Sequence, residues 1–210
     1  MNGRRRTAGS YARRGPVREP YDRVLIVCEG KKTEPYYFGG LRLHYRLSSA
    51  NIEITPANGT DPMSIVSFAE ARLDEYDRVF CVFDRDGHQN YDDALARVAQ
   101  SAETNAGKLV AITSWPCFEL WLLLHFYYSA APFNRAGRKS SCERVISKLI
   151  NYIPSYTKGQ RLIYDLLASK TPDALRHGSR LHRENLQTGS TNPSTRVHLL
   201  VEYLIALRPA

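Results

Sequence analysis

Two apolar runs of this chain end in acidic residues. The run "RVLIVCE" ends in Glu29, and "VFCVFDRD" carries Asp84 and Asp86. Carboxylates that gather in one place repel each other, so they need protons or hard cations, and oxygen ligands suit Mg²⁺ or Mn²⁺. Gly30 and Gly87 follow directly and let the backbone turn and a phosphate approach. The pattern predicts a divalent-metal site, although an isolated Asp-x-Asp is also typical of a loop cap or a solvated turn.

Five further residues are candidates for the same site. Glu119 lies in the apolar segment "SWPCFELWLLLHF", where an unpaired carboxylate would be costly, so it either pairs with an arginine or faces the acidic rim. Glu34 either supports the carboxylates or is an ordinary residue of a first helical turn. His88 is a candidate ligand or base, with a structural role as the alternative. Lys31 and Lys158 are candidate phosphate contacts, with solvated lysines as the alternative.

Buried strands must position these residues. The apolar and alternating runs predict four strands, separated by helices, at residues 23–29, 51–57, 78–84 and 108–114. This alternation favours an α/β fold with a mostly parallel sheet flanked by helices. Functional groups of parallel sheets gather at the carboxyl ends of the strands. If the first and third strands are neighbours, Glu29, Asp84 and Asp86 converge on one rim.

Charge divides the chain into three parts. Residues 1–20 carry six arginines and one glutamate and predict a flexible basic arm. Residues 21–133, the predicted α/β domain, carry 10 basic and 15 acidic residues. Strand signals disappear after residue 133, so residues 134–210 are predicted to be a helical extension, with a helix start capped by Asn192 or Ser194. Residues 134–186 carry 11 basic and 4 acidic residues, which suggests a surface for polyanions or merely a solvated face.

Composition excludes several classes of protein. No apolar stretch approaches the roughly 20 residues that span a bilayer, and no apolar segment follows the first arginines as in a secretory signal. The four cysteines are far apart, and three lie in apolar runs. This spacing favours reduced core thiols over a disulfide framework or a zinc site. We therefore expect a cytoplasmic protein.

The acidic pattern resembles the Toprim fold of topoisomerases, primases and OLD-type nucleases, which place a glutamate after the first strand and an Asp-x-Asp after the third. Four blocks in order narrow the resemblance to the RloB-like family, which is related to the abortive-infection AbiLii proteins: "LIVCEGKKTEPYYF", "VFDRDGH", "SWPCFELWLLLHF" and "NPSTRVHLLVEYL". The resemblance implies a Toprim-like, metal-dependent nuclease of phage defence, often encoded with an ABC-like ATPase partner. It also strengthens the case for Glu119.

The expected reaction is hydrolysis of a phosphodiester in DNA or RNA such as tRNA, with Glu29, Asp84 and Asp86 holding Mg²⁺ or Mn²⁺ and Glu119 as a further ligand. The basic C-terminal region, and the arm as a second candidate, would hold the nucleic acid. A non-catalytic module that binds nucleic acid or regulates an ATPase is the main alternative. "FDRDG" also resembles the nucleophile motif of haloacid-dehalogenase-like phosphatases, but here it follows the third strand, His88 follows its glycine, and no later acidic pair stands out.

Overall fold

The computed structural model describes residues 22–85, 87–101 and 107–208. The predicted arm at residues 1–20 lies outside this range. Five strands form one sheet: β1 (Val24–Cys28), β2 (Ile52–Pro56), β3 (Arg78–Asp84), β4 (Leu109–Trp115) and β5 (Ser194–Thr195). Their order is β2-β1-β3-β4-β5, and the neighbours among the first four pair in parallel. The mostly parallel α/β fold expected from the alternation is confirmed.

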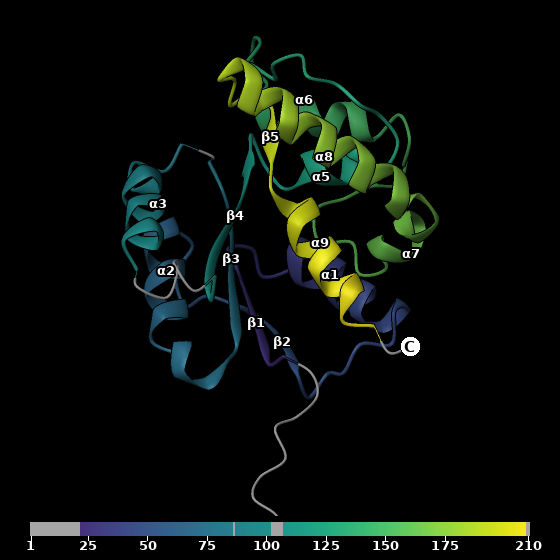
Figure 1. Ribbon diagram of the computed structural model, residues 1–210. Coiled ribbons are helices and arrows are strands. Elements are labelled where there is room, and N and C mark those ends of the chain that lie inside the picture. The colour runs from purple at the N-terminus through teal and green to yellow at the C-terminus, as the bar shows by residue number, and fades with distance from the viewer. Residues whose placement is uncertain (1–21, 86, 102–106, 209–210) are drawn as a thin grey trace, which may run out of the picture.

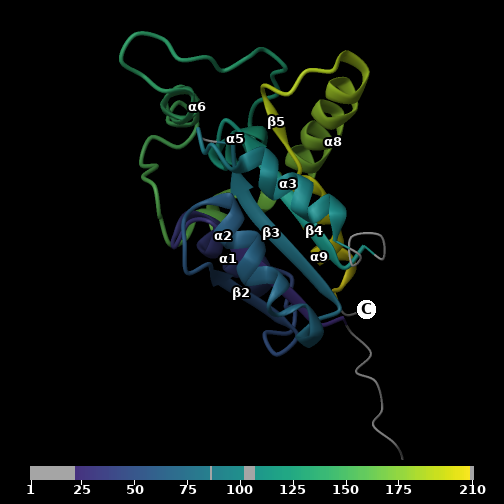
Figure 2. The same ribbon diagram turned by 90° about the vertical axis from the view of Figure 1, so that its left-hand side faces the viewer.

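Two helices cover one face of the sheet, α2 (Pro62–Glu70) and α3 (Tyr91–Gln100), as Figures 1 and 2 show. Successive side chains of a strand point to opposite faces, so the odd-numbered residues Val79, Cys81 and Phe83 of β3 enter the core under these helices. Asp61 caps the start of α2, since its carboxylate accepts the Ser64 N–H at 3.1 Å.

The opposite face carries most of the helical mass (Figure 1). Its helices are α1 (Thr33–His44), α5 (Glu119–Leu124), α6 (Ser141–Leu149), α7 (Ile163–Leu167), α8 (Thr171–Thr188) and α9 (Val197–Ala206). Short 3-10 turns follow α2 and α7, at Leu73–Glu75 and Ala168–Lys170. The even-numbered Phe80 and Val82 of β3 enter this core, together with the fully buried Trp121. Within the run "CFELWLLLHFYY", residues Glu119–Leu124 form α5.

The C-terminal region contributes a strand as well as helices. β5 pairs antiparallel with the end of β4, so the prediction that strands stop at residue 133 is wrong. The segment at Asn192 and Ser194 enters this strand instead of capping a helix, and α9 begins only at Val197. Two paired residues are too few to produce a periodic sequence pattern, which explains why the strand was missed.

The prediction of reduced thiols is wrong for two of the four cysteines. Cys117 and Cys142 form a disulfide that joins the segment before α5 to α6, while Cys28 and Cys81 are free and buried. Contact between residues 25 positions apart depends on tertiary packing and has no local signature in the sequence. Within the described ranges, none of the helices combines the length and the apolar character needed to cross a bilayer.

Candidate functional site

The strand order places a switch point between β1 and β3. The chain leaves β1 to form β2 on one side and then returns to form β3 on the other. Open parallel sheets bind ligands at such points, outside the carboxyl ends of the strands. Glu29 and Asp84 lie at these two ends, and the Asp84 N–H donates to Glu29 Oε2 at 2.9 Å. β1 and β3 are neighbours, so the condition for Glu29 and Asp84 to converge is met.

Neighbouring groups fix these two carboxylates. His88 Nε2 lies 3.2 Å from Glu29 Oε1, whereas the Asp84 N–H contacts the other oxygen, Oε2. Asp84 Oδ2 accepts the Phe118 N–H at 3.0 Å, just before α5 begins. Because both carboxylates are held at one oxygen by main-chain N–H groups, their positions depend on the sheet and on the start of α5 rather than on flexible side chains.

Glu34 joins them from the first turn of α1. Its carboxylate lies against Gly30, where a Cβ would overlap it, so a larger residue at position 30 would displace the Glu34 side chain. Glu34 is 8% exposed. Its pKa is raised to about 7, mainly by burial and also by the negative charges of Glu119 and Glu29, against the lowering effect of main-chain hydrogen bonds. Glu34 is thus both a first-turn residue and a member of the acidic group.

Glu119 completes the group from the start of α5. It is 2% exposed and accepts a hydrogen bond from the Tyr156 hydroxyl at 3.1 Å. Its cationic partner is a lysine rather than an arginine, because Lys158 Nζ lies 3.5 Å from Oε1. Cys142 Sγ lies 3.5 Å from the other oxygen. Of the two alternatives for Glu119, the structure supports a position facing the acidic rim.

These carboxylates share one cavity of about 500 Å³, which we call the acidic pocket: it is lined by Glu29, Glu34, Asp84, Glu119 and their neighbours, including Lys31, Lys32, Thr60 and Lys158. The three lysines are exposed, whereas Glu34 and Glu119 are buried. The Gly159 N–H donates to Thr33 Oγ1 at 3.0 Å and so ties the loop that carries Lys158 to the start of α1. The pocket therefore has a negative interior and a positive entrance.

The negative interior is not compensated from within. Burial raises the pKa of Asp84 well above its usual value, and the charges of Glu34 and Glu29 raise it further, while the hydrogen bond from Phe118 lowers it. Such carboxyls stay ionised only beside a cation. Hard oxygen donors without a buried positive group fit a divalent ion such as Mg²⁺ or Mn²⁺. The described carboxylates thus match the predicted metal in donor type, while no three of them bring ligand atoms within 4.8 Å of one another.

A second ligand set overlaps this pocket. Among the described residues, the one group of three potential ligands with atoms all within 4.8 Å of one another is Cys117, Glu119 and Cys142. The two cysteines are joined in a disulfide, so they offer no thiolate to a metal. Of this group, only the carboxylate of Glu119 is therefore left for a hard ion.

The family of the chain can now be stated. A family model described as RloB-like protein matches residues 24–204, which covers most of the chain. The chain belongs to the RloB-like family. The match includes the four acidic residues of the pocket. A search of curated proteins found no match to this RloB-like chain.

The structure thus brings most of the predicted residues of this RloB-like protein together, and it adds others. Glu29, Asp84, Glu119, Glu34, Lys31 and Lys158 line the pocket, and His88 contacts Glu29. Asp86 lies outside the described residues. Sequence reasoning missed Tyr156, because nothing in "SYTKGQR" links this tyrosine to a glutamate 37 positions earlier. It also missed the main-chain N–H of Phe118, which has no side-chain signal.

Proposed function

We propose that this RloB-like protein is a metal-dependent nuclease that hydrolyses phosphodiesters of DNA or RNA in the acidic pocket. One observation carries the proposal: four carboxylates converge at the switch point between β1 and β3, beneath exposed lysines. Buried acids alone would repel a phosphate. Acids that hold a cation, with lysines at the entrance of the pocket, can bind a phosphate. Phosphoryl chemistry requires this arrangement.

The roles of the residues follow from their positions. Glu29 and Asp84 would hold Mg²⁺ or Mn²⁺, with Asp86 as a predicted ligand and Glu119 as a further candidate. The chemistry that such an ion supplies is activation of water and stabilisation of the leaving oxygen. His88 orients Glu29 through its hydrogen bond. Glu34, whose pKa is about 7, can hold or release a proton at neutral pH.

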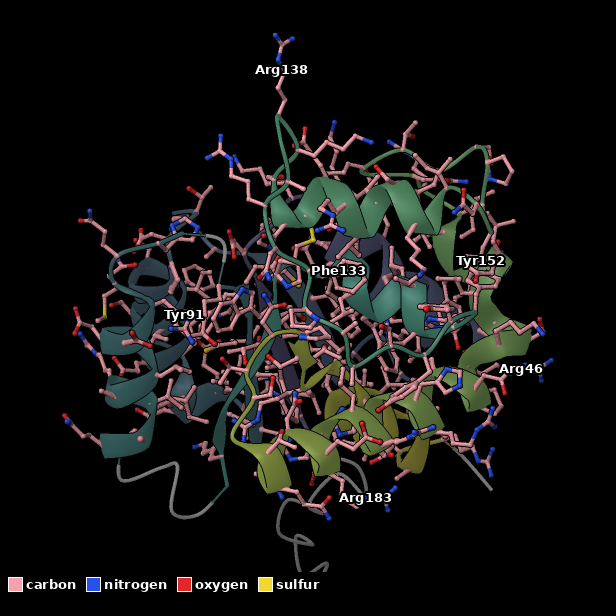
Figure 3. The ribbon with its side chains drawn as sticks, turned by 90° about the horizontal axis from the view of Figure 1, so that it is seen from above. Arg46, Tyr91, Phe133, Arg138, Tyr152 and Arg183 are labelled. Atoms are coloured by element: carbon pink, nitrogen blue, oxygen red, sulfur yellow. A yellow bond between two sulfur atoms is a disulfide. The ribbon has the colours of Figure 1, made fainter. Side chains whose placement is uncertain are left out.

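Positive charge beside the pocket supports a nucleic-acid substrate. Arg135, Arg138, Lys139 and Arg144 are exposed on the segment before α6 and on its first turn. Figure 3 looks down on this end of the molecule and shows Arg138 extending outward. Cys142 lies between these cations in sequence and contacts Glu119 of the pocket, so the same helix that carries Arg144 reaches the pocket wall. Contacts of this kind with the phosphate backbone weaken steeply with salt.

The biological setting belongs to the proposal as well. The Toprim resemblance of the acidic pattern favours cleavage over mere binding. The relation to abortive-infection proteins favours a role in cytoplasmic phage defence together with an ABC-like ATPase. Activity that depends on such a partner would make the isolated protein silent, so the assay should be run with and without the ATPase wherever one is encoded beside the gene.

The test is a cleavage assay on mixed tRNA, single-stranded DNA and plasmid, with Mg²⁺, Mn²⁺ or EDTA. Cleavage by the wild type should require the ion. Asp84→Asn keeps the size of the side chain and should reduce the rate by about 1,000-fold, which corresponds to about 4 kcal/mol of transition-state stabilisation. Asp74→Asn is the matched control, because Asp74 is exposed and does not line the pocket.

Two results would contradict the proposal. The first is cleavage that persists in EDTA or in Asp84→Asn, which would point to a contaminant or to another site. The second is a folded wild-type protein that binds nucleic acid yet cuts none of the substrates, alone or with the ATPase. That second outcome would favour the non-catalytic, regulatory alternative.

A further inference from the structure

A second cavity opens beside the carboxyl end of β3, at the β4–β5 edge of the sheet. It measures about 420 Å³ and lies between α3, the β4–β5 edge and the end of α8. Figure 2 draws α3, β4, β5 and α8 in one view. We call it the arginine pocket, because Arg85 and Arg196 line it together with Tyr91, Trp115 and His182. Its size falls within the range of about 300 to 1,000 Å³ that is typical of ligand sites.

The alternation of β3 explains why the two cavities adjoin. Asp84 continues the even-numbered positions and faces the acidic pocket with Phe118. Arg85 is the next residue and therefore faces the α3 side, where it contacts Tyr91. Because consecutive Cα atoms are about 3.8 Å apart, a single extended ligand can reach both residues.

Aromatic rings hold Arg85 in place. Its guanidinium lies over the Trp115 ring at 4.1 Å from the centroid and over the Tyr91 ring at 5.2 Å. Stacking fixes the plane of a guanidinium and leaves the N–H groups at its edge free for a phosphate or a carboxylate. None of the salt bridges within the described part of the chain, which omits Asp86, involves Arg85 or Arg196.

Arg196 adds a second positive charge on the same side. It is exposed just before α9, and its N–H donates to the Thr113 carbonyl at 2.9 Å, beside the end of β4. Burial raises the pKa of Tyr91, whereas the charges of Arg85 and Arg196 lower it, so both guanidinium groups lie near this tyrosine. The walls add further groups that suit a nucleotide: the hydroxyls of Ser190, Thr191 and Ser194, and the apolar side chain of Leu186, which is 73% exposed.

We infer that the arginine pocket binds the nucleic-acid strand next to the phosphate that is cleaved in the acidic pocket. Arg85 and Arg196 contact a neighbouring phosphate, and the apolar and aromatic wall contacts the adjoining nucleotide. The position of the cut in this inference rests on the proposed nuclease function. The binding of the strand does not depend on it. A stacked arginine with aromatic neighbours favours a nucleic acid over an acidic protein segment, which would need no stacking surface.

Binding in EDTA separates this inference from catalysis. Fluorescence anisotropy with labelled single-stranded DNA and RNA should show that Arg85→Gln and Arg196→Gln each weaken binding by about tenfold, since each loses a charged hydrogen bond. The slope of log affinity against log salt should fall by about one in each variant. Arg183→Gln removes the same charge from an exposed position on α8 outside the pocket and should change affinity by less than about twofold.

Each other outcome overturns a different claim. Unchanged affinity in both folded variants, while Asp84→Asn abolishes cutting, would refute the arginine pocket and leave the nuclease intact. Affinity lost in both variants without any cleavage by the wild type would refute the nuclease and leave a binding site. Arg85-dependent binding of labelled poly-glutamate, with no binding of either nucleic acid, would overturn the inference in favour of an acidic protein partner. Arg196 is exposed, so its variant keeps the test valid if Arg85→Gln fails to fold.

Discussion

The acidic pocket and the arginine pocket share the carboxyl end of β3 but differ in the burial of their charged side chains. Asp84 and Arg85 are consecutive residues and face different sides of the sheet. In the acidic pocket, Glu34 and Glu119 are buried and push up the pKa of Asp84. In the arginine pocket, Arg196 is exposed and Arg85 rests on aromatic rings. One cavity concentrates charge away from water, and the other keeps its charge at the surface.

This difference shows which pocket needs a ligand. Buried like charges are costly unless protons or cations offset them, so the acidic pocket gains stability from a bound ion or from low pH. Exposed or stacked guanidinium groups carry no such penalty and are available to a polyanion. We therefore predict that the acidic pocket carries out the chemistry and that the arginine pocket provides affinity for the substrate.

The largest expected effect is a separation of kinetic parameters. Asp84→Asn should lower kcat by about 1,000-fold with little change in KM, because it removes an interaction needed in the transition state. Arg85→Gln should instead raise KM by about tenfold and leave kcat within a few fold, because a phosphate contact binds substrate and transition state alike. Steady-state kinetics on the preferred substrate measures both. Equal losses of kcat in the two variants would contradict the separate roles predicted for the two pockets.

A smaller effect concerns stability and pH. The folded protein holds the Glu34 proton more tightly than the unfolded chain, since the pKa rises from 4.5 to about 7. The stability that this provides is complete below pH 4.5 and is lost as the pH rises through 7. Glu34→Gln should therefore be more stable than the wild type at pH 8 by about 2 to 3 kcal/mol, and nearly equal at pH 4.5.

Urea unfolding in EDTA at both pH values tests this expectation. Asp92→Asn, an exposed acid of the arginine pocket, serves as the control and should change stability little at either pH. If Glu34→Gln destabilised the protein equally at both pH values, Glu34 would have an ordinary structural role in α1.

The smallest of these effects concerns the hydrogen bond that the Tyr156 hydroxyl donates to Glu119. Tyr156→Phe removes the hydroxyl that donates to this buried carboxylate, so it should reduce the free energy of unfolding by about 1 to 3 kcal/mol. Tyr152→Phe removes a hydroxyl from a side chain that is 41% exposed and should have almost no effect. Chemical denaturation of both variants compares them. A neutral Tyr156→Phe would mean that Lys158 and water suffice for Glu119.

Local patterns predicted the strands and the meeting of Glu29 with Asp84, because continuous apolar runs and strand–helix alternation are direct results of burial in a parallel sheet. The links made by tertiary packing were not predictable. Cys117 and Cys142 meet 25 positions apart, and Glu119 meets Lys158 across a loop. The pairing of β5 depends on two residues only. Arg85 gave no signal of its own, because its role depends on where Trp115 ends β4.

The central claim is that the acidic pocket is a divalent-cation site, and calorimetric titration with Mn²⁺ at pH 8 tests it most directly. The wild type should bind the ion, and Asp84→Asn should bind it at least about tenfold more weakly. Asp92→Asn, which alters an acid of the arginine pocket instead, should bind like the wild type. Equal affinity in the wild type and in a folded Asp84→Asn, or no binding by the wild type, would contradict the account.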